Sequence, residues 1–178
     1  MKLSEIAAEI AAVEPGRDVD AVHNFLRNSS VKALLDGEAG RGRTSAADYP
    51  EKEILRARIL LACSDVGLRA GEMADVAFAL RGTDALIPGI DTPPSAMNAG
   101  GALYLPGLDT IIRGIRAGET WEIQLRFTLS PEGVRHVRPW IRWTGWEDRS
   151  SWEMDWLHGE THLATVSIPA SSLLEPLL

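Results

Sequence analysis

Cysteine is almost absent from this 178-residue chain, and so are long apolar runs. Because Cys63 is the only cysteine, no disulfide can form within the chain, and the sequence does not require an oxidising compartment. No uncharged apolar run approaches the roughly 18 residues of a membrane-spanning helix. Residues 1–5 lead into a charged amphipathic segment and not into the apolar core of a signal peptide. We therefore expect a cytoplasmic protein that has no membrane partner.

The chain also has fewer basic than acidic residues. The chain has 18 lysines and arginines against 25 aspartates and glutamates, which gives a formal net charge of −7. This balance argues against an indiscriminate binder of polyanions, although it says little about a local basic site.

The sequence motifs of common enzymes are missing as well. We find no phosphate-binding glycine loop, no nucleophile elbow and no catalytic-triad order. His158 and His162 are four residues apart, but Gly159 and Thr161 disfavour the helix that would bring both imidazoles to one metal ion. We expect no enzymatic activity, no cofactor and no bound metal.

Tryptophan is unevenly distributed, which indicates two units with different roles. All six tryptophans fall in the final third of the chain, whereas all three lysines fall in the first third. Between them, residues 83–101 are rich in proline and glycine, as an interdomain linker is. The predicted organisation is an N-terminal domain over residues 1–82, a linker over 83–101 and a C-terminal domain over 102–178.

The N-terminal domain has a helical pattern. Leu3, Ile6 and Ile10 recur at the spacing of one apolar helix face, and Asp18 is a suitable N-cap for a second helix. Apolar spacing also predicts a third helix over residues 55–66 and a fourth over residues 73–80. Between the second and third helices, residues 36–48 have the glycine-rich composition of a hairpin or wing.

The C-terminal domain has a β pattern. Residues 121–129 alternate apolar and polar side chains, a turn signal occupies 130–133, and residues 134–143 supply a second strand, which together predict a hairpin. A further strand is expected over residues 163–168 and a short helix over residues 108–115. The predicted fold class is therefore α+β: a mostly helical winged helix-turn-helix with a small wing, followed by a small tryptophan-rich antiparallel β domain.

The order of the N-terminal elements is that of a winged helix-turn-helix. In that plan the second helix enters the major groove of DNA while the wing contacts phosphates. We expect base or phosphate contacts from His23, Asn24 and Arg27 on the second helix. The backbone contacts are expected from three arginines, namely Arg41, Arg43 and Arg56.

Residues 3–80 resemble the DNA-binding domain of the MerR family. The similarity lies in Ser4–Ala7, in Tyr49–Ile54 after the wing, and in Asp65–Met73, which is similar to the link between the last two helices of that domain. The resemblance implies sequence-specific binding of double-stranded DNA. Two family features are missing: the long dimerisation helix is replaced by the linker, and the effector cysteines of metal-sensing members are absent.

The predicted function is that of a bacterial or phage transcriptional regulator with a C-terminal dimerisation or sensing domain. Because one recognition helix reads only a few base pairs, we expect a homodimer. One alternative is a protein-interaction or inhibitor protein that keeps the fold without binding DNA, since residues 17–58 carry eight basic against seven acidic side chains. Another is a phage recombination or packaging protein that recognises DNA.

The tryptophan cluster has two interpretations. Large rings can fill the core of a small β domain, or they can line a ligand pocket or an interface with a partner protein. Trp140 and Trp143 are an odd number of positions apart, so a regular strand places them on opposite faces. The candidate ligand or interface residues are Trp121, Trp140, Trp143 and Trp146.

Overall fold

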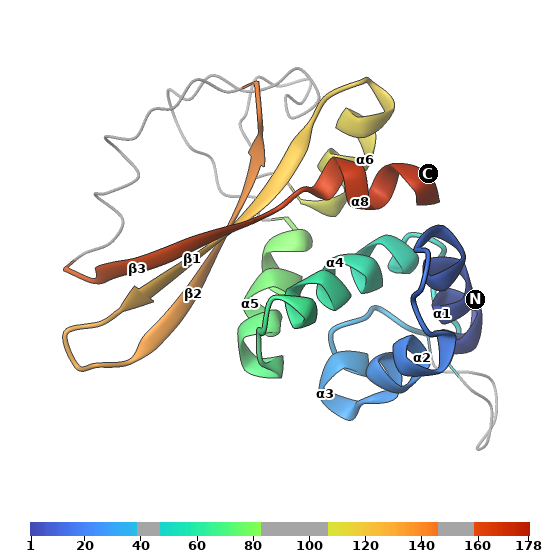
Figure 1. Ribbon diagram of the computed structural model, residues 1–178, viewed down its shortest axis with the longest axis horizontal. Helices are drawn as coiled ribbons and strands as arrows, with labels where there is room; N and C mark the ends of the chain where they lie inside the picture. Colours follow the sequence, from blue (N-terminus) through green and yellow to red (C-terminus); the bar gives the residue numbers. More distant parts are fainter. Residues whose placement is uncertain (39–46, 83–106, 146–158) are drawn as a thin grey trace. The chain divides into compact units, whose positions relative to one another are not determined.

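The computed structural model describes residues 1–38, 47–82, 107–145 and 159–178. It confirms the α+β class, with helices in the N-terminal part and a three-stranded antiparallel sheet towards the C-terminus (Figure 1). The chain divides into two compact units, the first made of Met1–Ala77 with Leu173–Leu178 and the second of Phe78–Ser172. None of the helices in these described ranges is long and apolar enough to cross a membrane.

The described part of the first unit contains the four predicted helices, although the fourth begins at Ala70 and not at Met73, and it also contains a short helix over residues 29–32 that was not predicted from the sequence. Their bounds are α1 (Leu3–Val13), α2 (Val19–Arg27), α3 (Ser29–Lys32), α4 (Glu53–Asp65) and α5 (Ala70–Leu80), the last of which continues into the second unit. Helix α1 packs against α2, α4 and the terminal 3-10 turn η2 (Glu175–Leu177). The C-terminal residues 173–178 therefore belong to the first unit, although the sequence predicts them as part of the C-terminal domain.

Specific side chains begin and end these helices. The Lys2 N–H donates to the Glu5 carboxylate at the start of α1, and the Asp20 N–H donates to the Asp18 side chain at the start of α2, as expected for that N-cap. Helix α4 is followed by Gly67, whose φ of 87° is the left-handed conformation that commonly ends a helix. The N-cap that the sequence predicts at Asp18 is therefore confirmed.

Helix α4 is buried on all sides from Glu53 to Cys63, which makes it an interior helix. Its burial includes two arginines and a glutamate, and burying such charges is costly unless each is paired. Their partners decide which arginines remain available for binding, as described below.

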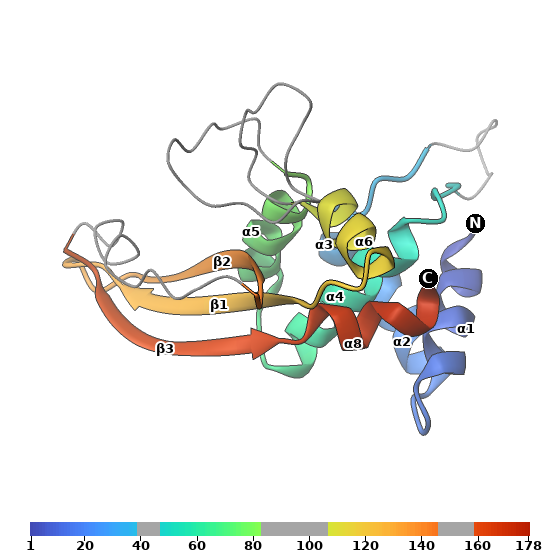
Figure 2. The ribbon, with the colours of Figure 1, turned by 90° about the horizontal axis from the view of Figure 1, so that it is seen from above.

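The second unit contains α6 (Leu108–Arg116) and the sheet, with β1 (Trp121–Leu129), β2 (Arg135–Trp143) and β3 (Thr161–Ile168). The strand order is β2-β1-β3 and both pairings are antiparallel (Figure 2). The predicted hairpin is confirmed, since Trp121 pairs with Trp143 at one end and Leu129 with Arg135 at the other. Helix α8 (Ala170–Leu174) follows β3 and begins in this unit.

Candidate nucleic-acid interface

Helix α2 has one buried side and one exposed side. Val22 and Leu26 are almost completely buried, and α2 packs against α1. Because a helix advances 100° per residue, positions 23, 24 and 27 lie away from the buried stripe that Val22 and Leu26 form. Asn24 and Arg27 are exposed and His23 is half-buried. The structure therefore places the three predicted residues of the second helix on one accessible stretch of α2.

The exposed stretch continues into α3 and carries no acidic residue. Residues 21–35 contain neither aspartate nor glutamate. Arg27 and Lys32 are both exposed, and neither makes an ion pair with any residue that the structure describes. Lys32 was not among the predicted site residues, although the acid-free run that contains it was visible in the sequence. We define the α2–α3 surface as the accessible side chains His23, Asn24, Arg27, Asn28, Ser29, Ser30 and Lys32.

The acidic residues of α2 lie at its other end. Asp18 and Asp20 flank the N-terminus, where the helix dipole favours negative charge, and Arg27 ends the helix, where the dipole favours positive charge. Asp20 and Arg27 are seven positions apart on the helix, a distance of about 10 Å along the axis. This separation keeps the carboxylates away from the basic end of α2.

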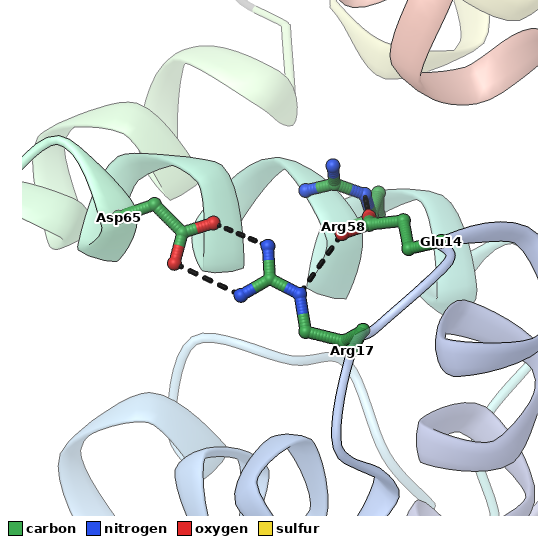
Figure 3. A network of polar contacts seen from close by, with 4 residues as sticks. All are labelled: Glu14, Arg17, Arg58 and Asp65. Atoms are coloured by element: carbon green, nitrogen blue, oxygen red, sulfur yellow. Dashed lines mark hydrogen bonds and ion pairs between the residues drawn. The ribbon is translucent and has the colours of Figure 1, made fainter.

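A network of four charged side chains fixes the turn before α2 against α4 (Figure 3). The Arg17 guanidinium donates to both oxygens of Asp65, at 3.1 and 2.7 Å, and to Glu14 at 2.9 Å. Arg58 pairs with the other oxygen of Glu14. The hydrogen bond with Asp65 is the largest cause that raises the pKa of Arg17 above its ordinary value. The network therefore sets where α2 begins and occupies both arginines.

The pKa of Arg58 is shifted in the opposite direction to that of Arg17. Desolvation lowers the pKa of Arg58, and the nearby Glu14 carboxylate only partly offsets this effect. Because the Arg58 side chain is 7% exposed and already paired, it holds α1 and α4 together and is not available to a phosphate.

The base of the loop over residues 36–48 is firmly held. Glu38 and Asp48 form an antiparallel bridge with two backbone hydrogen bonds of 2.7 and 3.0 Å. Lys2 pairs with Asp48 at 2.8 Å, and the Tyr49 N–H donates to the Met1 carbonyl at 2.8 Å. An isolated antiparallel bridge therefore joins residues 38 and 48, the two ends of the segment where the sequence predicts a wing; the wing itself stays a prediction. Arg41 and Arg43 lie outside the described residues.

Arg56 corrects one expectation. Its side chain is 4% exposed, and its Nη1 atom pairs with Asp36 at 2.5 Å and with Glu53 at 2.9 Å. The Glu53 carboxylate in turn accepts the Asp36 N–H at 2.9 Å. A guanidinium that is buried and doubly paired cannot contact a DNA backbone, so Arg56 is a structural residue that holds the loop base on α4. Glu53 and Arg56 are three positions apart on a helix, a spacing that favours an ion pair and that could have identified this pair from the sequence.

The tryptophans of the second unit occupy different environments. Trp121 is 1% exposed and donates from Nε1 to Glu119 at 3.1 Å, so it is a core residue, which corrects its expected role in ligand or partner contact. Trp143 lies opposite Trp121 and is half-buried. Trp140, paired with Gln124, lies on the other face, which confirms the predicted opposition of these two rings. Trp146 lies outside the described residues.

On its face of the sheet, Trp140 has a cation above it. The guanidinium carbon of Arg126 is 5.4 Å from the centre of the Trp140 ring, within the range of a cation–π interaction. Arg126 also donates to Gln124 at 3.1 Å. These contacts explain the position of Trp140 without a ligand, so the tryptophans of the sheet give weaker evidence for a site than the α2–α3 surface does.

Comparisons with protein families and with curated proteins found no match: no protein-family model matches the chain, and no curated protein matches it by sequence. The α2–α3 surface and the anchored loop base are therefore the features from which a function has to be argued.

Proposed function

We propose that this protein binds double-stranded DNA through the α2–α3 surface, with the loop over residues 36–48 as the wing of a winged helix-turn-helix. The observation that carries the proposal is that this surface is accessible and free of acidic residues, and that Arg27 and Lys32 have no ionic partner among the described residues. The other basic residues described above, Arg17, Arg56 and Arg58, are held by carboxylates. Two cations that have no ionic partner among the described residues, on a surface that carries no acidic residue, favour an anionic partner.

Helix α2 has the length and the side chains for base recognition. Its nine residues span about 13 Å, and an α-helix fits the major groove. Asn24 can make two hydrogen bonds to an adenine edge, and Arg27 can do the same with guanine. In this proposal His23 contacts a base or a phosphate beside them, and Lys32 contacts the phosphate backbone.

The wing supplies further backbone contacts. The two ends of the loop are held by the Glu38–Asp48 bridge and by the hydrogen bond from the Asp36 N–H to Glu53. In the proposal Arg41 and Arg43 reach phosphates beside the groove that α2 enters. The order of helices, hairpin base and helix pair agrees with the resemblance to the MerR family.

The surface chemistry also predicts how the protein finds its site. Because the net charge is −7, the long-range field does not draw the chain to DNA, and the affinity has to come from short-range contacts of a few cations. Sequence-specific contacts then carry a large share of the binding energy. A transcriptional regulator of a bacterial or phage operon fits this behaviour, with the second unit available for dimerisation or sensing.

Selection of bound sequences from random duplex DNA tests the proposal. We expect the full chain to enrich one motif, Asn24→Ala to lose discrimination at an adenine of that motif, and Arg27→Ala to weaken binding about tenfold or more. Arg69→Ala, which removes another exposed arginine just before α5, is the matched control and should bind as the wild type does. Failure to enrich any motif, or equal effects of Arg27→Ala and Arg69→Ala, would overturn the proposal and favour a protein partner for this surface.

A further inference from the structure

The two edges of the sheet differ in how well they are protected. Because β1 is central, β2 and β3 are the edge strands. Strand β2 contains Pro139, which has no backbone N–H to offer, and three arginines, and both features discourage pairing with another strand. Strand β3, with the sequence Thr-His-Leu-Ala-Thr-Val-Ser-Ile, has no proline, no carboxylate, no lysine and no arginine.

Strand β3 is also exposed over most of its length. All five residues from Thr161 to Thr165 are exposed, and Leu163 has 52% of its side chain accessible. The only strand that pairs with β3 within the described part of the chain is β1. Strand β3 therefore lies at one edge of the sheet (Figure 2), and the N–H and C=O groups on its outer side have no partner strand among the described residues.

We propose that β3 is a homodimer interface, at which it pairs antiparallel with β3 of a second copy of this chain to form a continuous six-stranded sheet. An antiparallel pair of identical strands is related by a twofold axis, so each copy offers the same surface and the assembly closes as a dimer. The strand is uncharged apart from His162, so two copies meet without strong repulsion. Over the regular part of the strand, residues 164–168, alternation of the outward-facing groups gives about one interchain hydrogen bond per residue.

Leu163 adds an apolar contribution to this interface. The β1–β3 pairing is irregular beside it, because Phe127 pairs with Ala164 and Thr128 with His162, so Leu163 is the extra residue of a bulge. A large apolar side chain that is half exposed next to an open edge gains burial when a second strand arrives. The inference is independent of DNA binding, although a twofold dimer would present two α2–α3 surfaces to a palindromic site.

The oligomeric state of the full chain in solution tests the inference, by light scattering with size exclusion and by sedimentation equilibrium. We expect the wild type to be a dimer and Leu163→Lys to raise the dissociation constant at least about tenfold, because a lysine on the edge opposes strand pairing. Val134→Lys is the matched control: Val134 is also 52% exposed but precedes β2, so this variant should stay dimeric. Circular dichroism checks that both variants keep the fold.

Single cysteines give a second readout that does not depend on weakening the interface. Residues that face each other across an antiparallel pair have Cα atoms about 4.5–5.5 Å apart, which suits a disulfide. At least one of Leu163→Cys, Ala164→Cys and Thr165→Cys should form a covalent dimer on oxidation, whereas Val134→Cys should not; the native Cys63 is buried and does not interfere. A monomeric wild type, a dimer that Leu163→Lys leaves unchanged, or crosslinking only at position 134 would each overturn the inference.

Discussion

Replacing Glu53 by alanine is expected to destabilise the first unit by about 3 kcal/mol. The Glu53 side chain is completely buried, accepts the Asp36 N–H at 2.9 Å and pairs with Arg56 at 2.9 Å. Removing one member of a buried ion pair costs about 3–5 kcal/mol, because the other charge stays buried without its partner. The lower end applies here, since Asp36 still contacts Arg56 at 2.5 Å after the substitution.

Urea unfolding followed by circular dichroism at 222 nm measures this loss. Tryptophan fluorescence is a poor probe of the first unit, because all six tryptophans follow residue 120. With a denaturant slope of about 2 kcal/mol per molar, the midpoint should fall by about 1.5 M. The control is Glu51→Ala, which removes an equal charge from an exposed position two residues earlier and should change the free energy of unfolding by less than about 0.5 kcal/mol. Equal losses in Glu53→Ala and Glu51→Ala would refute the reasoning.

The protonation of Glu53 gives a second test of the same group. Burial is the largest cause acting on this carboxyl and raises its pKa above the usual 4.5, despite the attraction of Arg56. An acid with a raised pKa in the folded state stabilises the fold most at pH values below its unfolded pKa, and this contribution is lost as the pH rises through the folded pKa. Glu53→Gln has no such titration. The stability of the wild type relative to Glu53→Gln should therefore fall as the pH rises from about 4 towards neutrality, and a rise would contradict the assignment.

Three further predictions concern packing and the turn before α2. Gly37→Ala should cost about 1–3 kcal/mol in the free energy of unfolding, because its Cβ would lie 2.5 Å from the Tyr49 ring, whereas Gly71→Ala, in open space on a helix, should stabilise by up to about 1 kcal/mol. Burial raises the pKa of the Cys63 thiol to about 12, so a thiol reagent at pH 8 should label it only at the rate at which the protein opens; rapid labelling of the native state would contradict its burial. Arg17→Lys should cost about 1 kcal/mol and lower the affinity for DNA, because lysine cannot donate to both oxygens of one carboxylate; unchanged unfolding and binding would show that the turn is held by other contacts.

Local sequence patterns predicted most of the fold. The N-cap Asp18, the turn before β2 and the alternation along β1 each depend on a few neighbouring residues, and each appears in the structure as expected. The assignment of residues 173–178 to the first unit could not be predicted in this way. It depends on packing between residues that are far apart in the sequence, which no local pattern records. The predicted linker over residues 83–101 lies outside the described residues and stays a prediction.

The candidate site was predictable only in part. Periodicity was enough to place Asn24 and Arg27 on the outer side of a helix, since their buried neighbours recur at helical spacing. The same reasoning could not tell a free arginine from a buried one, because the partners of Arg56 include a residue twenty positions away. Lys32 was missed because helical periodicity does not measure local charge. The signal that identifies it is the absence of acidic residues around it in the sequence.

The salt dependence of DNA binding tests the central claim most directly. The logarithm of the binding constant for a selected duplex should fall linearly with the logarithm of the salt concentration, because each phosphate neutralised releases counterions. If Lys32 contacts one phosphate and Arg27 contacts a guanine, the double variant Arg27→Ala/Lys32→Ala should weaken binding and reduce the slope by about 0.9, and Arg69→Ala should leave it unchanged. A double variant that binds with the slope of the wild type would show that the α2–α3 surface does not contact DNA.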